Sequence, residues 1–330
     1  MTFDVGELHP NSPHLFADLA ELLLLVNHNG RKFLHLNDLE SLLNAGPISS
    51  DEIDEDEEAD QSEKSSADQN SRRDRQLEDV FTQLGYRSKA FADFYPFKVD
   101  RDRIEIIEQL SVDQRIYCLL VACSRLRSFS KKGLAQRWAR HFSELSKAAL
   151  KGLLPTSAQT RIFDANSDDR KNYYGTKLSD ALVKLGGDLG VLSVNAEECG
   201  KAGSSGDGGF DLIAWIDFGD GGATNYAVLG QCGAQETGWP KKTLEAHSLN
   251  ARHYFQVQFD YPGVMFTPVC YRNSDGVWVS NKEANGVLLA DRVRILNLVK
   301  SNGNVSEIVD YAWFTLFESE FSEFKSKAGI

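Results

Sequence analysis

The chain has 330 residues, of which 42% are apolar and 25% are charged, so it is long enough for two globular domains and unlike a disordered or fibrous protein. Its net charge of −12 is uneven, because residues 51–68 contain ten acidic residues and one lysine and account for −9 of it. The −3 that remains for the rest of the chain does not exclude a nucleic-acid partner.

Cysteine use and hydropathy exclude further classes of protein. The five cysteines are scattered and form no CxxC pair, which argues against a disulfide framework and against a zinc ribbon. The longest aliphatic run, residues 22–26, is far too short to cross a bilayer. We therefore expect a cytoplasmic protein with no membrane partner.

Residues 1–155 carry the spacing that is typical of helices. Apolar side chains recur every three or four positions in 13–26 and 36–43. The same spacing continues in four later stretches: 77–84, 102–110, 112–126 and 133–154. The sequence therefore predicts an all-α N-terminal domain that ends at Pro155.

An acidic insertion interrupts this domain at about 48–75. Residues 49–75 hold one large aliphatic residue, Ile53, among many like charges, and such a segment cannot bury enough apolar surface to fold. We expect it to be disordered and to act as a solvated spacer. The other interpretation is an acidic mimic of DNA that covers a basic groove.

The last part of the helical domain is basic. Residues 125–151 contain eight lysines and arginines against one acid, Glu144, with aromatic residues between them. Such interleaving is typical of a phosphate-binding surface. The candidate DNA-binding residues are Arg125, Arg127, Lys131, Lys132, Arg137 and Arg140. The alternative is a helix whose long cationic side chains surround an aromatic core stripe.

Beyond the proline the pattern becomes α/β. A helix over 172–190, ended by glycine, precedes a strand over 190–198. Two further strands, 210–218 and 224–234, flank the glycine-rich turn at 219–222, which is a strong hairpin signal.

The rest of the chain continues the alternation. A helix over 240–258 has proline in its first turn, where proline is tolerated. A strand over 262–272 and two more helices follow, the last from near Asn304 through Phe324. This order predicts an α/β domain over 156–330.

The order αβββαβ, with an Asp at the start of the second strand and an amide late in the third, resembles the restriction-endonuclease-like fold of the PD-(D/E)xK nuclease superfamily. The segment GDGGFDLIA followed by GQC is most similar to the Mrr-type branch, in which G-D-x-G-x-D precedes the second strand and Gln-x-Lys replaces Glu-x-Lys. The resemblance covers residues 170–272 and does not extend to residues 1–155.

The predicted hairpin brings two oxygen-bearing side chains together. Asp211 opens one strand and Gln231 lies near the end of its antiparallel partner, so the two lie side by side. With the backbone carbonyl of Cys232 they form a set of hard oxygen ligands, which suits Mg²⁺ or Mn²⁺ rather than zinc. Because one carboxylate makes a weak site, we expect a second acid, Asp180 or Asp207, to complete it.

The resemblance also implies a lysine at the position of Gly233, which has no side chain to offer. In such nucleases the lysine holds the attacking water and stabilises negative charge in the transition state. We expect Lys241 or Lys242, at the start of the next helix, to take this role, with Lys177 on the preceding helix as the other candidate.

The resemblance implies a metal-dependent DNA endonuclease that serves as a bacterial restriction or anti-phage effector, and nucleases of this fold often pair as homodimers. The alternative is a catalytically inactive subunit. It would keep the nuclease fold, bind DNA or partner proteins in a multi-subunit defence complex, and leave the chemistry to another chain. The glycine at position 233 and the single carboxylate of the hairpin favour this alternative.

Overall fold

The computed structural model describes residues 2–48, 66–203, 206–245, 247–303 and 305–327, which form two compact units. Unit 1 comprises Met1–Trp138, Val269–Val279 and Ser306–Ile330, and unit 2 comprises Ala139–Pro268 and Ser280–Val305. Each unit is therefore discontinuous in sequence. The boundary predicted at residue 155 would instead assign all later residues to the second domain, including 269–279 and 306–330, which belong to unit 1.

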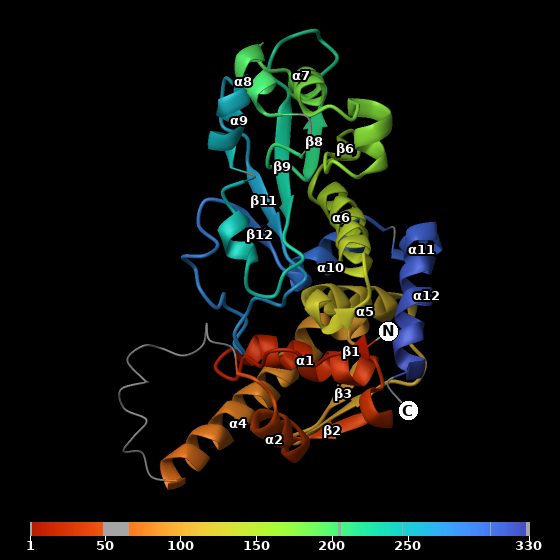
Figure 1. The fold of residues 1–330 in the computed structure, drawn as a ribbon. Helices are drawn as coiled ribbons and strands as arrows, with labels where there is room; N and C mark the ends of the chain where they lie inside the picture. The colour runs from red at the N-terminus through yellow and green to blue at the C-terminus, as the bar shows by residue number, and fades with distance from the viewer. Residues whose placement is uncertain (1, 49–65, 204–205, 246, 304, 328–330) are drawn as a thin grey trace. The chain divides into compact units, whose positions relative to one another are not determined.

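Helices make up most of unit 1 (Figure 1). They are α1 (Pro13–Leu25), α2 (Leu36–Ala45), α4 (Ser66–Phe91), α5 (Val112–Ser124), the start of α6 (Leu134–Leu153), most of α11 (Val305–Asp310), α12 (Ala312–Lys327) and the short 3-10 turns η1 (His28–Gly30), η3 (Ala92–Phe94) and η4 (Leu126–Ser128). The predicted helices over 13–26, 36–43 and 112–126 are confirmed. The last predicted helix is divided at Tyr311, whose carbonyl accepts the first hydrogen bonds of α12.

Unit 1 also contains strands, so the all-α prediction was wrong. Strands β2 (Phe33–His35), β4 (Arg103–Ile106) and β3 (Phe97–Val99) form an antiparallel sheet in that order, and β1 (Thr2–Phe3) pairs with β5 (Phe129–Ser130). Strand β4 occupies a segment that was predicted to be helical. Its residues alternate, because Ile104 is fully buried whereas Arg103 and Glu105 form an ion pair on the more exposed face.

Helix α4 begins at Ser66, inside the segment that was expected to be disordered up to residue 75. Residues 66–75 contain no glycine or proline and include several good helix formers. They extend the helix, whose buried face includes Leu77. The most acidic part of the predicted insertion, 49–65, lies outside the described residues.

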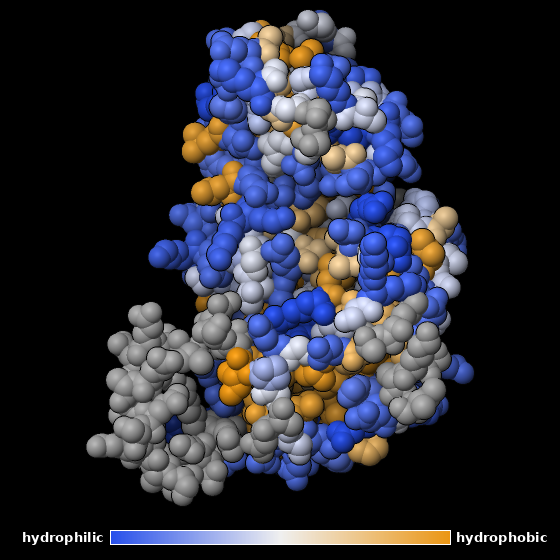
Figure 2. Space-filling model, in the orientation of Figure 1, coloured by the Kyte–Doolittle hydropathy of each residue, from blue (hydrophilic) through white to orange (hydrophobic). Residues whose placement is uncertain are grey.

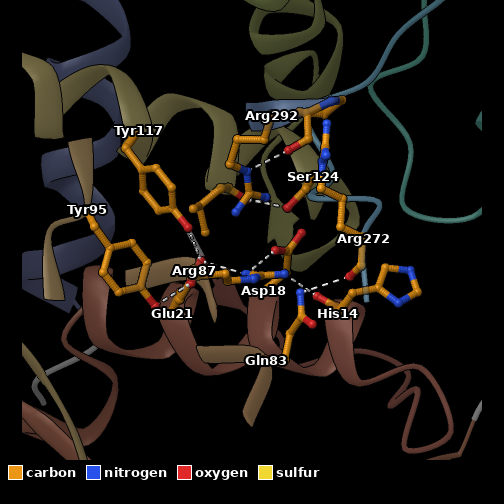
Figure 3. Close-up of polar contacts among 12 residues, drawn as sticks. His14, Asp18, Glu21, Gln83, Arg87, Tyr95, Tyr117, Ser124, Arg272 and Arg292 are labelled. Atoms are coloured by element: carbon orange, nitrogen blue, oxygen red, sulfur yellow. Dashed lines mark hydrogen bonds and ion pairs between the residues drawn. The ribbon is translucent and has the colours of Figure 1, made fainter. Parts of the chain in front are cut away.

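A network of charged groups is buried in unit 1 (Figure 3). Arg87 of α4 is fully buried and pairs with Asp18 at 2.7 Å and with Glu21 at 3.0 Å, both on α1. The hydroxyls of Tyr95 and Tyr117 donate to Glu21 at 2.9 and 2.8 Å. Buried charges are tolerated when they are paired and hydrogen-bonded, which explains why the buried helix α1 carries two acids.

A five-stranded mixed sheet forms the centre of unit 2 (Figure 1). The strand order is β12 (Leu288–Ala290), β11 (Gly263–Phe266), β9 (Tyr226–Cys232), β8 (Leu212–Ile216) and β6 (Gln159–Ile162). Neighbours β6, β8 and β9 are antiparallel, whereas β11 is parallel to β9 and to β12. The predicted order of a helical region followed by a sheet among helices is confirmed.

The other elements of unit 2 are the rest of α6, the π-helix η5 (Arg170–Tyr174), α7 (Leu178–Leu189), β7 (Ser193–Val194), α8 (Ala196–Lys201), the 3-10 turn η6 (Trp239–Lys242), α9 (Ser248–Tyr254), β10 (Phe255–Gln256) and α10 (Arg292–Ser301). The strand predicted over 190–198 is reduced to β7, which pairs with β10 outside the central sheet, because Asn195 caps and starts α8. The helix predicted over 240–258 is replaced by η6 and α9, since His247 caps a new helix start.

Helix α7 packs on one face of this sheet. Its buried leucines form a stripe at three- and four-residue intervals and join one core cluster with strand residues that include Ile213 and Leu229. Gly190, in the left-handed conformation, ends the helix. Because alternate strand residues share a face, Asp211 and Gln231 point to the same side of the sheet as Ile213 and Leu229.

The face of the molecule in Figure 2 is largely hydrophilic, with separate apolar areas. None of the helices among the described residues is long and apolar enough to cross a membrane.

Candidate metal centre

Three aspartates come together at one end of the antiparallel strands of unit 2. Asp164 follows β6 by two residues, Asp211 immediately precedes β8, and Asp207 lies in the glycine-rich loop before it. One carboxylate oxygen of each residue lies within 4.8 Å of one oxygen of each of the others. The backbone explains this meeting, since the N–H of Phe163 donates to the carbonyl of Asp211 at 2.7 Å.

Each of these three carboxylates, which we call the triad, has one oxygen fixed by a backbone N–H. The donors to Asp164, Asp207 and Asp211 are the amides of Asn166, Gly209 and Cys232, at 2.9, 2.8 and 2.8 Å. The second oxygen of each carboxylate accepts no hydrogen bond from the described part of the chain. Three such groups repel one another unless a proton or a cation lies between them.

Asp211 is the most buried member of the triad, with 8% of its surface exposed. Burial raises the pKa of Asp211 to about 7, and the charges of Asp207 and Asp164 act in the same direction. The hydrogen bond from the Cys232 amide and the charge of Lys242 oppose the shift. A carboxylate that is destabilised by burial and by like charges gains strongly from a bound divalent cation.

Gln231 lies beside Asp211, as the hairpin pattern predicts. The pairing of Leu212 with Gly230 makes Asp211 and Gln231 cross-strand neighbours on one face. The Nε2 of Gln231 donates to Oε2 of Glu245 at 2.8 Å. Its Oε1 is buried and, within the described residues, has no hydrogen-bond partner.

A buried carbonyl oxygen without a partner costs free energy, so the Oε1 of Gln231 is suited to ligate an ion held by the triad. Glu245 accepts the amide N–H of Gln231, which assigns the unpartnered atom of this amide as the oxygen. Three carboxylate oxygens and one amide oxygen form a hard donor set, which suits a metal ion that prefers oxygen ligands.

The position of Gly233 has no room for a side chain. A Cβ at this position would lie 2.4 Å from Cε of Met265 and 2.6 Å from Cβ of Trp239. The place that the Gln-x-Lys pattern gives to its lysine is therefore occupied by two side chains of the core. A lysine introduced there would have to displace them.

We expect Gly233→Ala to lower the free energy of unfolding by about 1–3 kcal/mol, the usual cost of overpacking. The matched control is Gly187→Ala in α7, where a Cβ would meet no atom within 4 Å. This control should be neutral or stabilising by up to about 1 kcal/mol because alanine favours helices. Denaturant titration of the two variants measures both effects. Equal stability of Gly233→Ala and the unmodified protein would contradict the conclusion that position 233 has no room for a side chain.

Two of the three candidate lysines lie near the triad. Burial raises the pKa of Glu245 as it does that of Asp211, and the charge of Lys242 opposes both shifts. Lys241 lines an open cavity of about 460 Å³ together with Asp207 and Glu245. Lys177 instead pairs with Asp180 at 3.3 Å, and both side chains are well exposed.

Asp180 therefore lies apart from the triad. It stands between Leu178 and Leu182 on α7, which face the core, so helical geometry directs its side chain to solvent. Of the two acids that the sequence offered, Asp207 is the one that joins Asp211. Cys232 contacts the triad through its N–H, and burial raises the pKa of its thiol.

Most of the candidate DNA-binding cations are engaged within unit 1. The Nη2 of Arg125 donates to the carbonyls of Val5 and Glu7, and the ion pairs are Arg127–Glu7, Lys131–Glu323 and Arg137–Glu320. Trp138 packs among aromatic residues of α12 and donates to Glu320 at 2.9 Å. Lys132 and Arg140 are exposed. These contacts match the packing of the alternative interpretation, an aromatic stripe surrounded by cations, and DNA binding by this segment stays a prediction.

Asp164, Glu245 and the strand that positions Asp164 were not predicted from the sequence. The segment 159–164, QTRIFD, has the form of a short strand followed directly by an acid. A strand of four residues is too short to distinguish from a loop by its pattern, so the acid directly after it was the remaining signal.

No protein-family model, curated protein or solved structure matches the chain.

Proposed function

We propose that unit 2 is a metal-dependent nuclease domain that hydrolyses phosphodiester bonds of DNA. The observation that supports this proposal is the triad of Asp164, Asp207 and Asp211 beside the unpartnered Oε1 of Gln231. The adjacent cavity is open and suits an extended polymer better than an enclosed small molecule. The resemblance to restriction-endonuclease-like proteins extends the proposal to a restriction or anti-phage role.

The residues of the site have distinct tasks in this proposal. The three aspartates hold the ion, with Gln231 as a neutral fourth ligand oriented by Glu245. A Mg²⁺ or Mn²⁺ held by these residues would supply Lewis-acid chemistry for the hydrolysis of a phosphodiester. Lys242 places a positive charge beside Asp211, where it stabilises the negative charge that develops on the phosphate in the transition state.

The test is the conversion of supercoiled plasmid to nicked and linear forms in EDTA, Mg²⁺, Mn²⁺ or Ca²⁺, with linear duplex DNA, single-stranded DNA and RNA as further substrates. We expect cleavage of DNA in Mg²⁺ or Mn²⁺ and none in EDTA. Cleavage that persists in EDTA would contradict the proposal.

Lysine substitutions separate the candidate cations. Lys242→Met should slow nicking about 100-fold, the usual effect of removing one transition-state donor, while Mn²⁺ binding persists. Lys241→Met, on the cavity wall, should have a smaller effect. Lys177→Met is the matched control, because that side chain pairs with Asp180 in solvent. Initial nicking rates at saturating Mg²⁺ measure the effect of each substitution. An equal loss of rate in Lys177→Met would contradict the specific role proposed for Lys242.

A second candidate function is a catalytically inactive subunit that binds DNA or a partner protein. The closed position of Gly233 favours it, because the core side chains of Met265 and Trp239 occupy the place of the lysine. This candidate predicts Mn²⁺ or DNA binding without cleavage in any metal. It is preferred over the first if the purified protein binds Mn²⁺ at the triad and leaves every substrate intact.

A further inference from the structure

Arg170 joins the two chain segments that carry Asp164 and Asp207. It is fully buried. Its Nη1 donates to the carbonyl of Phe163 at 3.3 Å and to that of Gly206 at 3.0 Å. These carbonyls belong to the residues immediately before Asp164 and Asp207. One guanidinium nitrogen therefore ties together the backbones of two ligands that are 43 residues apart in sequence.

Further contacts fix the guanidinium itself. Its Nε donates to the carbonyl of Gly175 at 2.9 Å, and its Cζ lies 4.7 Å from the centre of the Phe163 ring. The backbone N–H of Arg170 donates to the hydroxyl of Ser167. The planar fork is thus held at several points, which a lysine ammonium cannot reproduce.

The charge of Arg170 also acts on the triad. The carboxylates of Asp207 and Asp164 stabilise the guanidinium, although burial disfavours its charge. The buried Nη2 donates to no acceptor within the described residues. The charge therefore offsets part of the repulsion between the acids without taking the carboxylate oxygens that an ion needs.

We propose that Arg170 is a positioning residue for the metal centre, which holds the backbones before Asp164 and Asp207 at the spacing that a divalent cation requires. This inference rests on the proposed metal centre and adds a residue that does not contact the ion. Residues that orient metal ligands typically contribute about 10- to 100-fold to metal affinity.

The test measures Mn²⁺ affinity from the free-Mn²⁺ signal in electron paramagnetic resonance, without DNA, at a temperature where circular dichroism shows every variant folded. Arg170→Lys keeps the charge and loses the fork, so we expect affinity to fall about 10-fold, and Arg170→Met should approach a 100-fold loss. The matched control is Arg161→Lys, since Arg161 stacks on Tyr173 and pairs with Asp169. It should bind Mn²⁺ like the unmodified protein.

The outcomes separate this inference from the proposed function. Unchanged affinity in Arg170→Lys, with normal binding by the unmodified protein, overturns the role of Arg170 and leaves the metal centre intact. An equal loss in Arg161→Lys overturns it as well, because the effect would then be general. If the unmodified protein does not bind Mn²⁺, or if Asp211→Asn binds Mn²⁺ equally well, the proposed metal centre is wrong. This inference is then wrong as well. If Arg170→Met does not fold, the lysine variant decides.

Discussion

Asp211→Asn should abolish metal-dependent nicking of plasmid DNA. The substitution keeps the size of the side chain and an oxygen that can accept the Cys232 amide, but it removes the most buried charge of the triad. A bound ion contributes several kcal/mol to transition-state stabilisation, so we expect a loss of about 1000-fold or more. Nicking rates across a Mg²⁺ titration measure the effect and show whether excess metal restores activity.

The control is Asp180→Asn, an acid of the same unit that is exposed and paired with Lys177. It should cleave DNA as the unmodified protein does. Normal nicking by Asp211→Asn would remove the triad from the mechanism, and inactivity of Asp180→Asn would move the site to α7.

The free energy of unfolding should depend on pH because of the carboxyl group of Asp211. The folded-state pKa of Asp211, about 7, lies above its ordinary value of 3.8. Between these pH values the folded protein keeps a proton that the unfolded chain has released, so stability falls as pH rises through this window. At about 1.4 kcal/mol per pKa unit, the full cost is on the order of 4 kcal/mol above pH 7.

Asp211→Asn should remove this cost because the amide does not ionise. In EDTA we expect the variant to be more stable than the unmodified protein at pH 8, with an advantage that shrinks by more than half as the pH falls to 5 and disappears only below the ordinary pKa of 3.8. Denaturant titrations at four pH values measure the difference. Mg²⁺ at 100 times its Kd should raise the free energy of unfolding of the unmodified protein by about 2.7 kcal/mol. It should not stabilise Asp211→Asn. A pH-independent difference would show that the carboxyl of Asp211 is ionised throughout.

The hairpin and its two polar residues could be predicted from the sequence because both depend on local pattern. The apolar runs of 210–218 and 224–234 and the glycine-rich turn between them predict the hairpin, and the observed register places Asp211 beside Gln231. The exposed position of Asp180 was also predictable, since it lies out of phase with the leucine stripe of α7. The helical phase of α7 therefore distinguishes Asp180 from the acids of the triad.

The rest of the site depends on contacts between distant segments. Strand β6 has only four residues and lies at the edge of the sheet, so its pattern is too short to distinguish from a loop. Charge density likewise marked Arg127 and Arg137 as candidates to bind DNA. Their partners, Glu7 and Glu320, are 120 and 183 residues away, and no local pattern connects them. The strand β4 was missed because isoleucines at 104 and 106–107 satisfy a helical and an alternating pattern equally well.

The last residues of the chain complete the unit that the first residues begin. Phe317 and Phe321 of α12 pack against Trp138, and Phe324 packs against Phe129. A ribosome synthesises the chain from its N-terminus, and domains generally fold as they emerge. All of unit 2 has been synthesised once residue 305 is added, whereas unit 1 still lacks these three aromatic side chains. Unit 1 therefore cannot complete its aromatic core until α12 has been added, whereas every residue of unit 2 precedes α12 in the sequence.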